Sequence, residues 1–321
     1  MATAHLYEQI SRNKRNSVIL IITVFLLLTM VGYCFGSIYG DPVVWLVLAA
    51  GFALFYTVIS YAVGDGIVLM SMRAKPIAKP DNPQLFNVVE EMSIASGLPM
   101  PKVYLIQSAA SNAFATGRSP EKASIAVTSG LLENVNREEL QAIIGHEMAH
   151  IKNFDTRFAI LMAVMVGAIA LLCDAFWRGM RYSRGSSRGS SSKGGGQLAL
   201  LIAALVLAIL APIAAKMIQL AMSRRRELLA DNTSVELTRN PNALANALEK
   251  IAKDPDELDL ANRGTQHLFI VNPLRAAKDI KREKAGKPVN SEKSGWFDTH
   301  PPIALRVRLL REMAHTVSPT G

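Results

Sequence analysis

One short pattern in the chain is suited to metal chemistry: His146-Glu147-Met148-Ala149-His150. Residues four apart on an α-helix lie one turn apart on nearly the same face, so both imidazoles can point at one metal ion. Glu147 lies beside them, where it can take a proton from a water molecule held by the metal. Zinc suits such a site because it accepts imidazole and carboxylate ligands and acidifies its water. The pattern therefore predicts one Zn²⁺ per chain and hydrolysis with Glu147 as the base.

A catalytic zinc site also needs a third protein ligand and an open position for water. One common arrangement places a histidine six residues after the second imidazole, but Thr156 occupies that position. The other arrangement uses a glutamate on a later helix, and Glu227 is the best candidate. Asp231 lies one turn further along and is expected to accept a hydrogen bond from a ligand imidazole. Glu236 is a weaker candidate ligand, because it lies further along the same segment.

The elements that position these residues follow from capping signals and hydrophobic patterning. Asn136 followed by Glu139 is a capping box that begins the helix carrying the metal-binding pattern. Asn82-Pro83 begins an earlier helix, which Gly97 ends. Three short β-rich runs predict a small sheet packed over that earlier helix, and they cover residues 102–107, 113–116 and 123–128.

The composition indicates membrane segments. Half of the residues are apolar and 19% are charged, which is unusual for a soluble enzyme. Residues 17–36 and 43–64 carry no charge and are long enough to cross a bilayer, which takes about 20 apolar residues. Basic residues flank this pair on both sides, so the positive-inside rule places both flanks in the cytoplasm. We attribute the net charge of +9 to anionic lipid headgroups and not to nucleic acid, because aromatic residues are few.

Two later apolar runs, 158–177 and 198–222, leave two topologies open. The Gly/Ser-rich linker between them, 178–197, carries five basic residues, which the positive-inside rule would keep in the cytoplasm. Two full spans would place this linker on the outer side, whereas a hairpin that does not cross would avoid the conflict. All metal ligands must lie on one side of the membrane, and both topologies satisfy that condition. We favour two spans.

The expected fold class is a mainly α integral membrane protein with a cytoplasmic, gluzincin-like α+β metalloprotease domain that contains a small β-sheet. Its expected parts, in chain order, are a membrane hairpin over 1–70, a protease part over 71–156, a second membrane hairpin over 157–222 and a cytoplasmic helical part with the third ligand over 223–321.

Several stretches resemble the HtpX-type membrane zinc endopeptidases, bacterial relatives of the CAAX prenyl proteases. Besides the metal-binding pattern, they are NAFATG (112–117), AVTSGLL (126–132), SRRRELLAD (223–231) and THPP (299–302). They run in the family's order, with four apolar runs in the family's places, so the resemblance covers nearly the whole chain. The resemblance implies zinc ligands at His146, His150 and Glu227 with Glu147 as base. It also implies a stress-linked protease that cleaves misfolded or damaged membrane proteins at the cytoplasmic face of the bacterial inner membrane.

The resemblance further implies residues that contact the substrate. The strand at 112–116, with Asn112, Ala113 and Phe114, would pair with the substrate backbone through main-chain hydrogen bonds. The alternative is an ordinary edge strand. His300 and Arg306 fall where the family places polar groups near the scissile carbonyl, and His300 would stabilise a developing oxyanion. The alternative is a turn-capping histidine and a surface arginine.

A second class of function stays open at this point, a membrane scaffold or chaperone with a non-catalytic zinc site. Structural zinc usually has four protein ligands, and the sequence offers no evident fourth. A function that survives chelation would favour the scaffold. A transporter is disfavoured because the charges inside the apolar runs, Asp174 and Lys216, form no convincing pathway.

Overall fold

The computed structural model describes residues 41–161, 224–256, 258, 268–271 and 301–317, and near the N-terminus residues 11, 15–19, 21–23, 25–26, 28–30 and 33. The chain divides into two compact units. The first comprises Met1–Lys14, Asp65–Ile160 and Ala221–Gly321, and the second Arg15–Gly64 and Leu161–Leu220. The apolar run 198–222, the linker 178–197 and most of the run 158–177 lie outside the described residues, so the choice between two spans and a hairpin stays a prediction.

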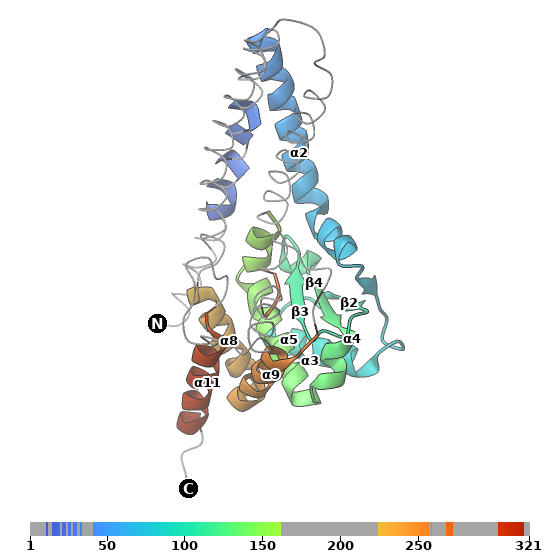
Figure 1. Cartoon of the computed structure of the whole chain (residues 1–321), viewed down its shortest axis with the longest axis vertical. Helices are drawn as coiled ribbons and strands as arrows, with labels where there is room; N and C mark the ends of the chain where they lie inside the picture. The colour runs from blue at the N-terminus through green and yellow to red at the C-terminus, as the bar shows by residue number, and fades with distance from the viewer. Residues whose placement is uncertain are drawn as a thin grey trace, which may run out of the picture. The chain divides into compact units, whose positions relative to one another are not determined.

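Helix α2 (Pro42–Ser71) has the length and composition to cross a membrane (Figure 1). Only 11% of its most apolar 18-residue stretch is buried. Asp41 begins the helix by accepting a hydrogen bond from the backbone N–H of Val43 at 2.8 Å. Large side chains such as Val47 and Phe55 are 64% and 65% exposed, which favours a lipid environment over water. The helix covers the span expected at 43–64.

The first unit contains a four-stranded sheet with the order β1-β2-β4-β3. The strands are β1 (Lys75–Pro76), β2 (Lys102–Ile106), β3 (Ala113–Thr116) and β4 (Ser124–Thr128). β2 and β4 are parallel, while β1 pairs with β2 and β3 pairs with β4 in antiparallel fashion. The last three strands lie within one residue of the expected β-rich runs. β3 is therefore an edge strand of this sheet.

The helices of this unit pack on the sheet and on one another, and one of them, α5, carries the metal-binding pattern. They are α3 (Pro83–Ser96), α4 (Ser129–Asn134), α5 (Arg137–Lys152), α8 (Arg224–Thr238), α9 (Pro241–Lys253) and α11 (Ile303–Val317), with a short 3-10 helix at Pro120–Lys122. α3 begins at the Asn82 cap and ends at Gly97, whose φ of 70° is the left-handed conformation that glycine adopts without strain. α5 begins with both hydrogen bonds of the expected Asn136–Glu139 capping box. It lies between the sheet and helices α8 and α9 (Figure 1).

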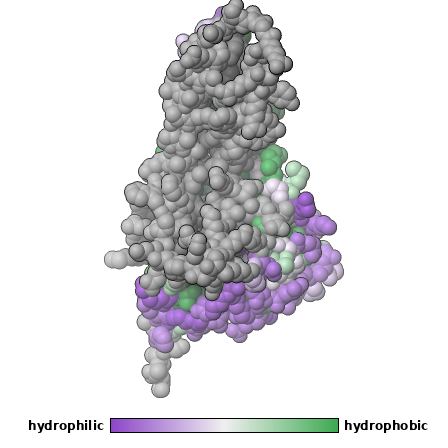
Figure 2. Space-filling model, in the orientation of Figure 1, coloured by the Kyte–Doolittle hydropathy of each residue, from purple (hydrophilic) through white to green (hydrophobic). Residues whose placement is uncertain are grey.

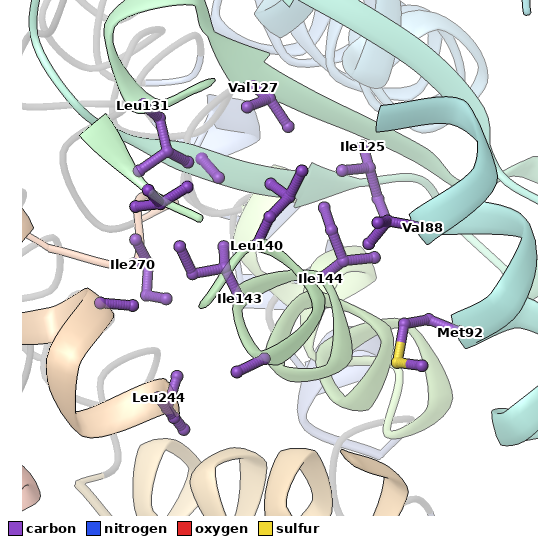
Figure 3. Packing of buried hydrophobic residues seen from close by; sticks show 14 of the residues in the cluster. Val88, Met92, Ile125, Val127, Leu131, Leu140, Ile143, Ile144, Leu244 and Ile270 are labelled. Carbon is purple, nitrogen blue, oxygen red and sulfur yellow. The ribbon is translucent and has the colours of Figure 1, made fainter. Parts of the chain in front are cut away.

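The hydrophobic core is built around α5. Its Leu140, Ile143 and Ile144 are at most 1% exposed, and burying each such side chain contributes about 1.5–3 kcal/mol. Their neighbours come from α3, β4, α4, α9 and the segment 268–271, and include Val88, Met92, Ile125, Val127, Leu131, Leu244 and Ile270 (Figure 3). Hydrophilic side chains cover much of the described surface of this unit in Figure 2. Packing on several sides gives α5 a rigid setting.

Candidate metal centre

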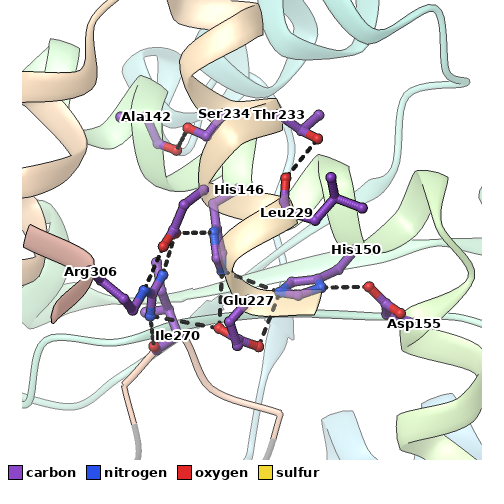
Figure 4. Close-up of polar contacts among 11 residues, drawn as sticks. Ala142, His146, His150, Asp155, Glu227, Leu229, Thr233, Ser234, Ile270 and Arg306 are labelled. Carbon is purple, nitrogen blue, oxygen red and sulfur yellow. Dashed lines mark hydrogen bonds and ion pairs between the residues drawn. The ribbon is translucent and has the colours of Figure 1, made fainter. Parts of the chain in front are cut away.

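The three predicted metal ligands lie together in the first unit (Figure 4). The Nε2 atoms of His146 and His150 are 3.2 Å apart. The carboxylate of Glu227, from α8, places Oε2 at 3.7 Å from the Nε2 of His146 and Oε1 at 3.6 Å from the Nε2 of His150. Within the described residues, this is the one group of His, Cys, Asp or Glu side chains whose ligand atoms gather in this way.

Close packing of two helices brings Glu227 to the histidines. The hydroxyl of Ser234 on α8 donates a hydrogen bond of 2.6 Å to the carbonyl of Ala142 on α5. Gly145 faces the same contact, and a Cβ atom there would lie 3.2 Å from the hydroxyl oxygen of Ser234, which is tighter than an ordinary contact. The absence of a side chain at position 145 therefore lets α8 approach α5 closely, about two turns beyond the glutamate.

The donor atoms fit a tetrahedral zinc ion. Bonds of about 2.0–2.1 Å to imidazole nitrogen and carboxylate oxygen imply ligand atoms about 3.3 Å apart in a tetrahedron. The separation of the two Nε2 atoms, 3.2 Å, agrees with that value, and the Glu227 carboxylate brings one oxygen to 3.7 Å from the Nε2 of His146 and its other oxygen to 3.6 Å from the Nε2 of His150. Two imidazole nitrogens and one carboxylate oxygen are also the donor types that a catalytic zinc site uses, with the fourth position left to water.

Each histidine is oriented by a carboxylate on its other ring nitrogen. The Nδ1 of His146 lies 3.0 Å from the Oδ1 of Asp231, as the sequence predicts, and the Nδ1 of His150 lies 3.0 Å from the Oδ2 of Asp155. These contacts turn both Nε2 atoms toward the metal position and set the tautomer that binds a metal. Sequence reasoning missed Asp155. The available signal was an acidic residue five positions after the second histidine, just beyond the end of the helix.

A short turn and an arginine hold Asp155 in place. α5 ends at Lys152 with Asn153 as its C-cap. Phe154 has a φ of 58°, which is rare outside glycine and reverses the chain so that the next residue faces the helix end. The guanidinium of Arg226 lies 3.6 Å from Asp155 and 5.3 Å from the centre of the Phe158 ring. Arg226 directly precedes the ligand Glu227, so the start of α8 contributes to both sides of the centre.

Replacing Asp155 with Asn is expected to weaken zinc binding by about 10–100-fold, the usual cost of losing a carboxylate behind a ligand histidine. The amide keeps the size of the side chain but removes the charge that favours a strongly donating imidazole. Competition with a chromogenic chelator measures the zinc affinity, and Asp256→Asn, at an exposed position, serves as the control. An unchanged affinity in the Asp155 variant would refute this role.

In the centre, oppositely charged partners offset the effect of burial on the pKa of the ionisable side chains. Burial would lower the pKa of His150, but the hydrogen bond with Asp155 and the charge of Glu227 outweigh it and raise that pKa to about 9. A metal ion binds neutral imidazole, so metal uptake at neutral pH would release this proton. Burial likewise opposes the charge of Asp231, yet the Arg306 guanidinium holds the pKa of that carboxyl well below its usual range.

The predicted base, Glu147, lies in the same buried region. It is 1% exposed, and this burial raises its pKa, against the opposing effect of the nearby imidazoles. The backbone of Ala115 in β3 forms a hydrogen bond with its carboxylate. Its Oε1 atom is buried and has no hydrogen-bond partner among the residues that the structure describes. A carboxylate with raised pKa and one unused oxygen is suited to accept a proton.

The residues predicted to contact substrate are engaged within the protein. The side-chain amide of Asn112 donates to the carbonyl of Val271 at 2.9 Å, and the carbonyl of Ala113 accepts from the N–H of Ile270 at 3.1 Å. Phe114 is fully buried and packs edge-to-face against Phe269 at 5.2 Å. A role in substrate binding for these residues stays a prediction.

The predictions for His300 and Arg306 are tested to different extents. His300 lies outside the described residues. Arg306 has no exposed surface, so the alternative of a surface arginine is wrong. Its guanidinium contacts Asp231, Glu227 and the carbonyl of Ile270.

A metallopeptidase of the H-E-x-x-H type is built in this way, with paired histidines on one helix, a glutamate from a second helix and a buried glutamate at the same point. Comparison with known proteins agrees. The profile of Peptidase family M48 matches residues 79–314. A protein named Protease HtpX homolog from Listeria monocytogenes is 39% identical over 316 residues, covering 96% of this chain and all of the relative. Its namesake from Thermoanaerobacter pseudethanolicus is 38% identical over 313 residues, covering 98% and 99%.

The chain therefore belongs to peptidase family M48, and it is a metalloendopeptidase. The resemblance inferred from the sequence motifs is confirmed. Among solved structures, the crystal structure of S. mikatae Ste24p aligns with a TM-score of 0.47 at 18% identity, covering 95% of this chain and 67% of that chain. That likeness is too low to support an argument about function.

Proposed function

We propose that this protein is a zinc-dependent endopeptidase of the bacterial cytoplasmic membrane that cleaves misfolded or damaged membrane proteins. The observation that carries the proposal is the convergence of His146, His150 and Glu227 on one point, with Glu147 buried beside them. The long apolar helix α2 supports a membrane location. The basic residues that follow it, Arg73, Lys75 and Lys79 in the sequence, favour a catalytic unit on the cytoplasmic side, facing anionic headgroups.

Each residue of the centre has its own role in peptide hydrolysis. Zinc, when held by the three ligands, supplies a Lewis acid that polarises a carbonyl oxygen and acidifies water. Glu147 takes the proton from the attacking water and then passes it to the leaving amine. Its raised pKa suits both steps, because the carboxyl must gain and lose a proton near neutral pH. Asp231 and Asp155 keep the two imidazoles oriented during the reaction.

We further propose that substrates bind as an added strand along β3. The N–H of Thr128 donates to the carbonyl of Asn112, so the alternating pattern of an antiparallel pair turns the main chains of Ala113 and Ala115 away from β4. Main-chain pairing at that edge depends little on the sequence of the substrate, as a protease for unfolded substrates requires. The carbonyl of Ala113 accepts a hydrogen bond from Ile270, and the backbone of Ala115 bonds the Glu147 carboxylate, so a substrate pairs at each residue only when that bond opens.

Metal removal tests the proposed function. The protein is purified in detergent with a chelator, and casein digestion is measured before and after zinc is added. We expect digestion to rise at least about 100-fold with zinc, because the Lewis acid contributes several kcal/mol to the barrier. Self-cleavage on zinc addition would support the same conclusion. Equal digestion in chelator and in zinc would contradict it, and a cellular function that survives chelation would favour the scaffold or chaperone.

A further inference from the structure

Arg306, in the first turn of α11, is a charged side chain with no exposed surface. Its Nε donates to the Oδ2 of Asp231 at 2.8 Å, and its Nη2 donates to the Oδ1 at 2.6 Å. The two parallel bonds form the bidentate fork that binds a carboxylate most rigidly. A buried guanidinium without such partners would be strongly destabilising, so this pair determines where the end of Asp231 lies.

The same guanidinium is connected to two of the three metal ligands, directly to Glu227 and through Asp231 to His146 (Figure 4). The Oδ1 of Asp231 that accepts from Nη2 also lies 3.0 Å from the Nδ1 of His146. The Nη1 of Arg306 lies 3.6 Å from the Oε2 of Glu227, which is the oxygen at 3.7 Å from the Nε2 of His146. Arg306 thus restrains the His146 imidazole through Asp231, and it restrains Glu227 directly by its own charge.

We propose that Arg306 is a positioning residue that holds His146 and Glu227 in metal-binding geometry, rather than a residue that contacts the substrate. The inference rests on the proposed zinc function. The flat guanidinium is essential to this role because it donates to both oxygens of Asp231 while a third nitrogen faces Glu227. A lysine carries the same charge but presents a single ammonium, which cannot occupy these positions at once.

The Nη1 atom that faces Glu227 is also linked to strand β3, through Ile270 of the segment 268–271. Nη1 donates to the carbonyl of Ile270 at 3.1 Å, and the N–H of Ile270 donates to the carbonyl of Ala113 at 3.1 Å. The side chain of Asn112 holds the neighbouring carbonyl of Val271. Arg306 is therefore fixed from the sheet as well as from α8, so it cannot follow the ligands if they move. This second anchor is what a positioning residue needs.

Zinc affinity of the Arg306→Lys variant tests the proposal, measured on the full chain in detergent by competition with a chelator. We expect an affinity about 10–100-fold weaker than that of the wild type. At saturating zinc we expect KM within about 2-fold of the wild type, and kcat/KM restored in large part, because the ligands are still present. The matched control is Arg311→Lys on the same helix, whose guanidinium bonds Asn242 and Asn246 of α9. It should keep wild-type zinc affinity.

Asp231→Asn provides a second route if Arg306→Lys does not fold, as judged by circular dichroism. It should also weaken zinc binding, because Arg306 restrains His146 through Asp231. If Arg306→Lys does fold, its effect should be smaller in the Asp231→Asn background than in the wild type. Wild-type zinc affinity with a raised KM in Arg306→Lys would overturn the proposal and favour substrate contact. Wild-type affinity in Asp231→Asn would overturn it too. A wild-type protein that binds no zinc would instead refute the proposed function.

Discussion

Replacing Glu147 with Gln is expected to lower kcat/KM for casein by about 10²–10⁴-fold while zinc stays bound. The amide has the size and shape of the carboxylate and can still accept the hydrogen bond from Ala115, so the buried site keeps its packing. It cannot accept the proton of the attacking water. Because Glu147 is not among the three ligand side chains, metal binding does not depend on it.

The measurement pairs a casein digestion rate with the zinc content per chain of the purified variant. Glu138→Gln is the matched control, because Glu138 lies on the same helix at an exposed position and contacts the side chain of Asn240. This control should digest casein at the wild-type rate. Undiminished cleavage by the Glu147 variant would rule out the assigned mechanism. Loss of zinc from it would mean that the carboxylate has a structural part in the centre.

Replacing Glu227 with Ala is expected to remove zinc and all measurable proteolysis. The change deletes a ligand outright, so the affinity should fall by more than the 10–100-fold range of an outer carboxylate, at least about 100-fold. It also leaves the charge of Arg306, 3.6 Å from the lost oxygen, without one of its partners. Zinc content after dialysis and casein digestion report the two effects separately.

Glu236→Ala is the control for this prediction, because Glu236 lies on the same helix and was the weaker candidate for third ligand. It is not part of the described metal-binding group, and its replacement should leave zinc bound and activity unchanged. Full zinc occupancy in the Glu227 variant, with loss in the Glu236 variant, would reverse the ligand assignment.

The features that depend only on residues close together in the sequence were predictable from it. The H-E-x-x-H spacing places both imidazoles on one helical face whatever the rest of the chain does. The Asn136 capping box and the Asn82 and Gly97 ends of α3 are equally local, and all of them occur as expected. The apolar stretch of α2 could be predicted for the same reason, since length and composition alone decide whether a helix suits a bilayer.

Other features depend on residues far apart in the chain. That Glu227 reaches the histidines was a choice among candidates until the close packing of α8 on α5 through Ser234 and Gly145 settled it. The left-handed Phe154 turn that brings Asp155 to His150 has no strong sequence signal, because bulky residues rarely adopt that conformation. In the sequence alone, Arg306 could have been a surface side chain.

The sequence by itself determined the chemistry: two imidazoles, a base between them and a helix to present them. These follow from the local periodicity of the backbone. Only the tertiary structure decided which carboxylates lie beside the two imidazoles and that an arginine from α11 is buried against two of those carboxylates, Asp231 and Glu227. Such contacts are set by how helices distant in sequence pack together, and that packing is a property of the whole core, which no short stretch of residues encodes.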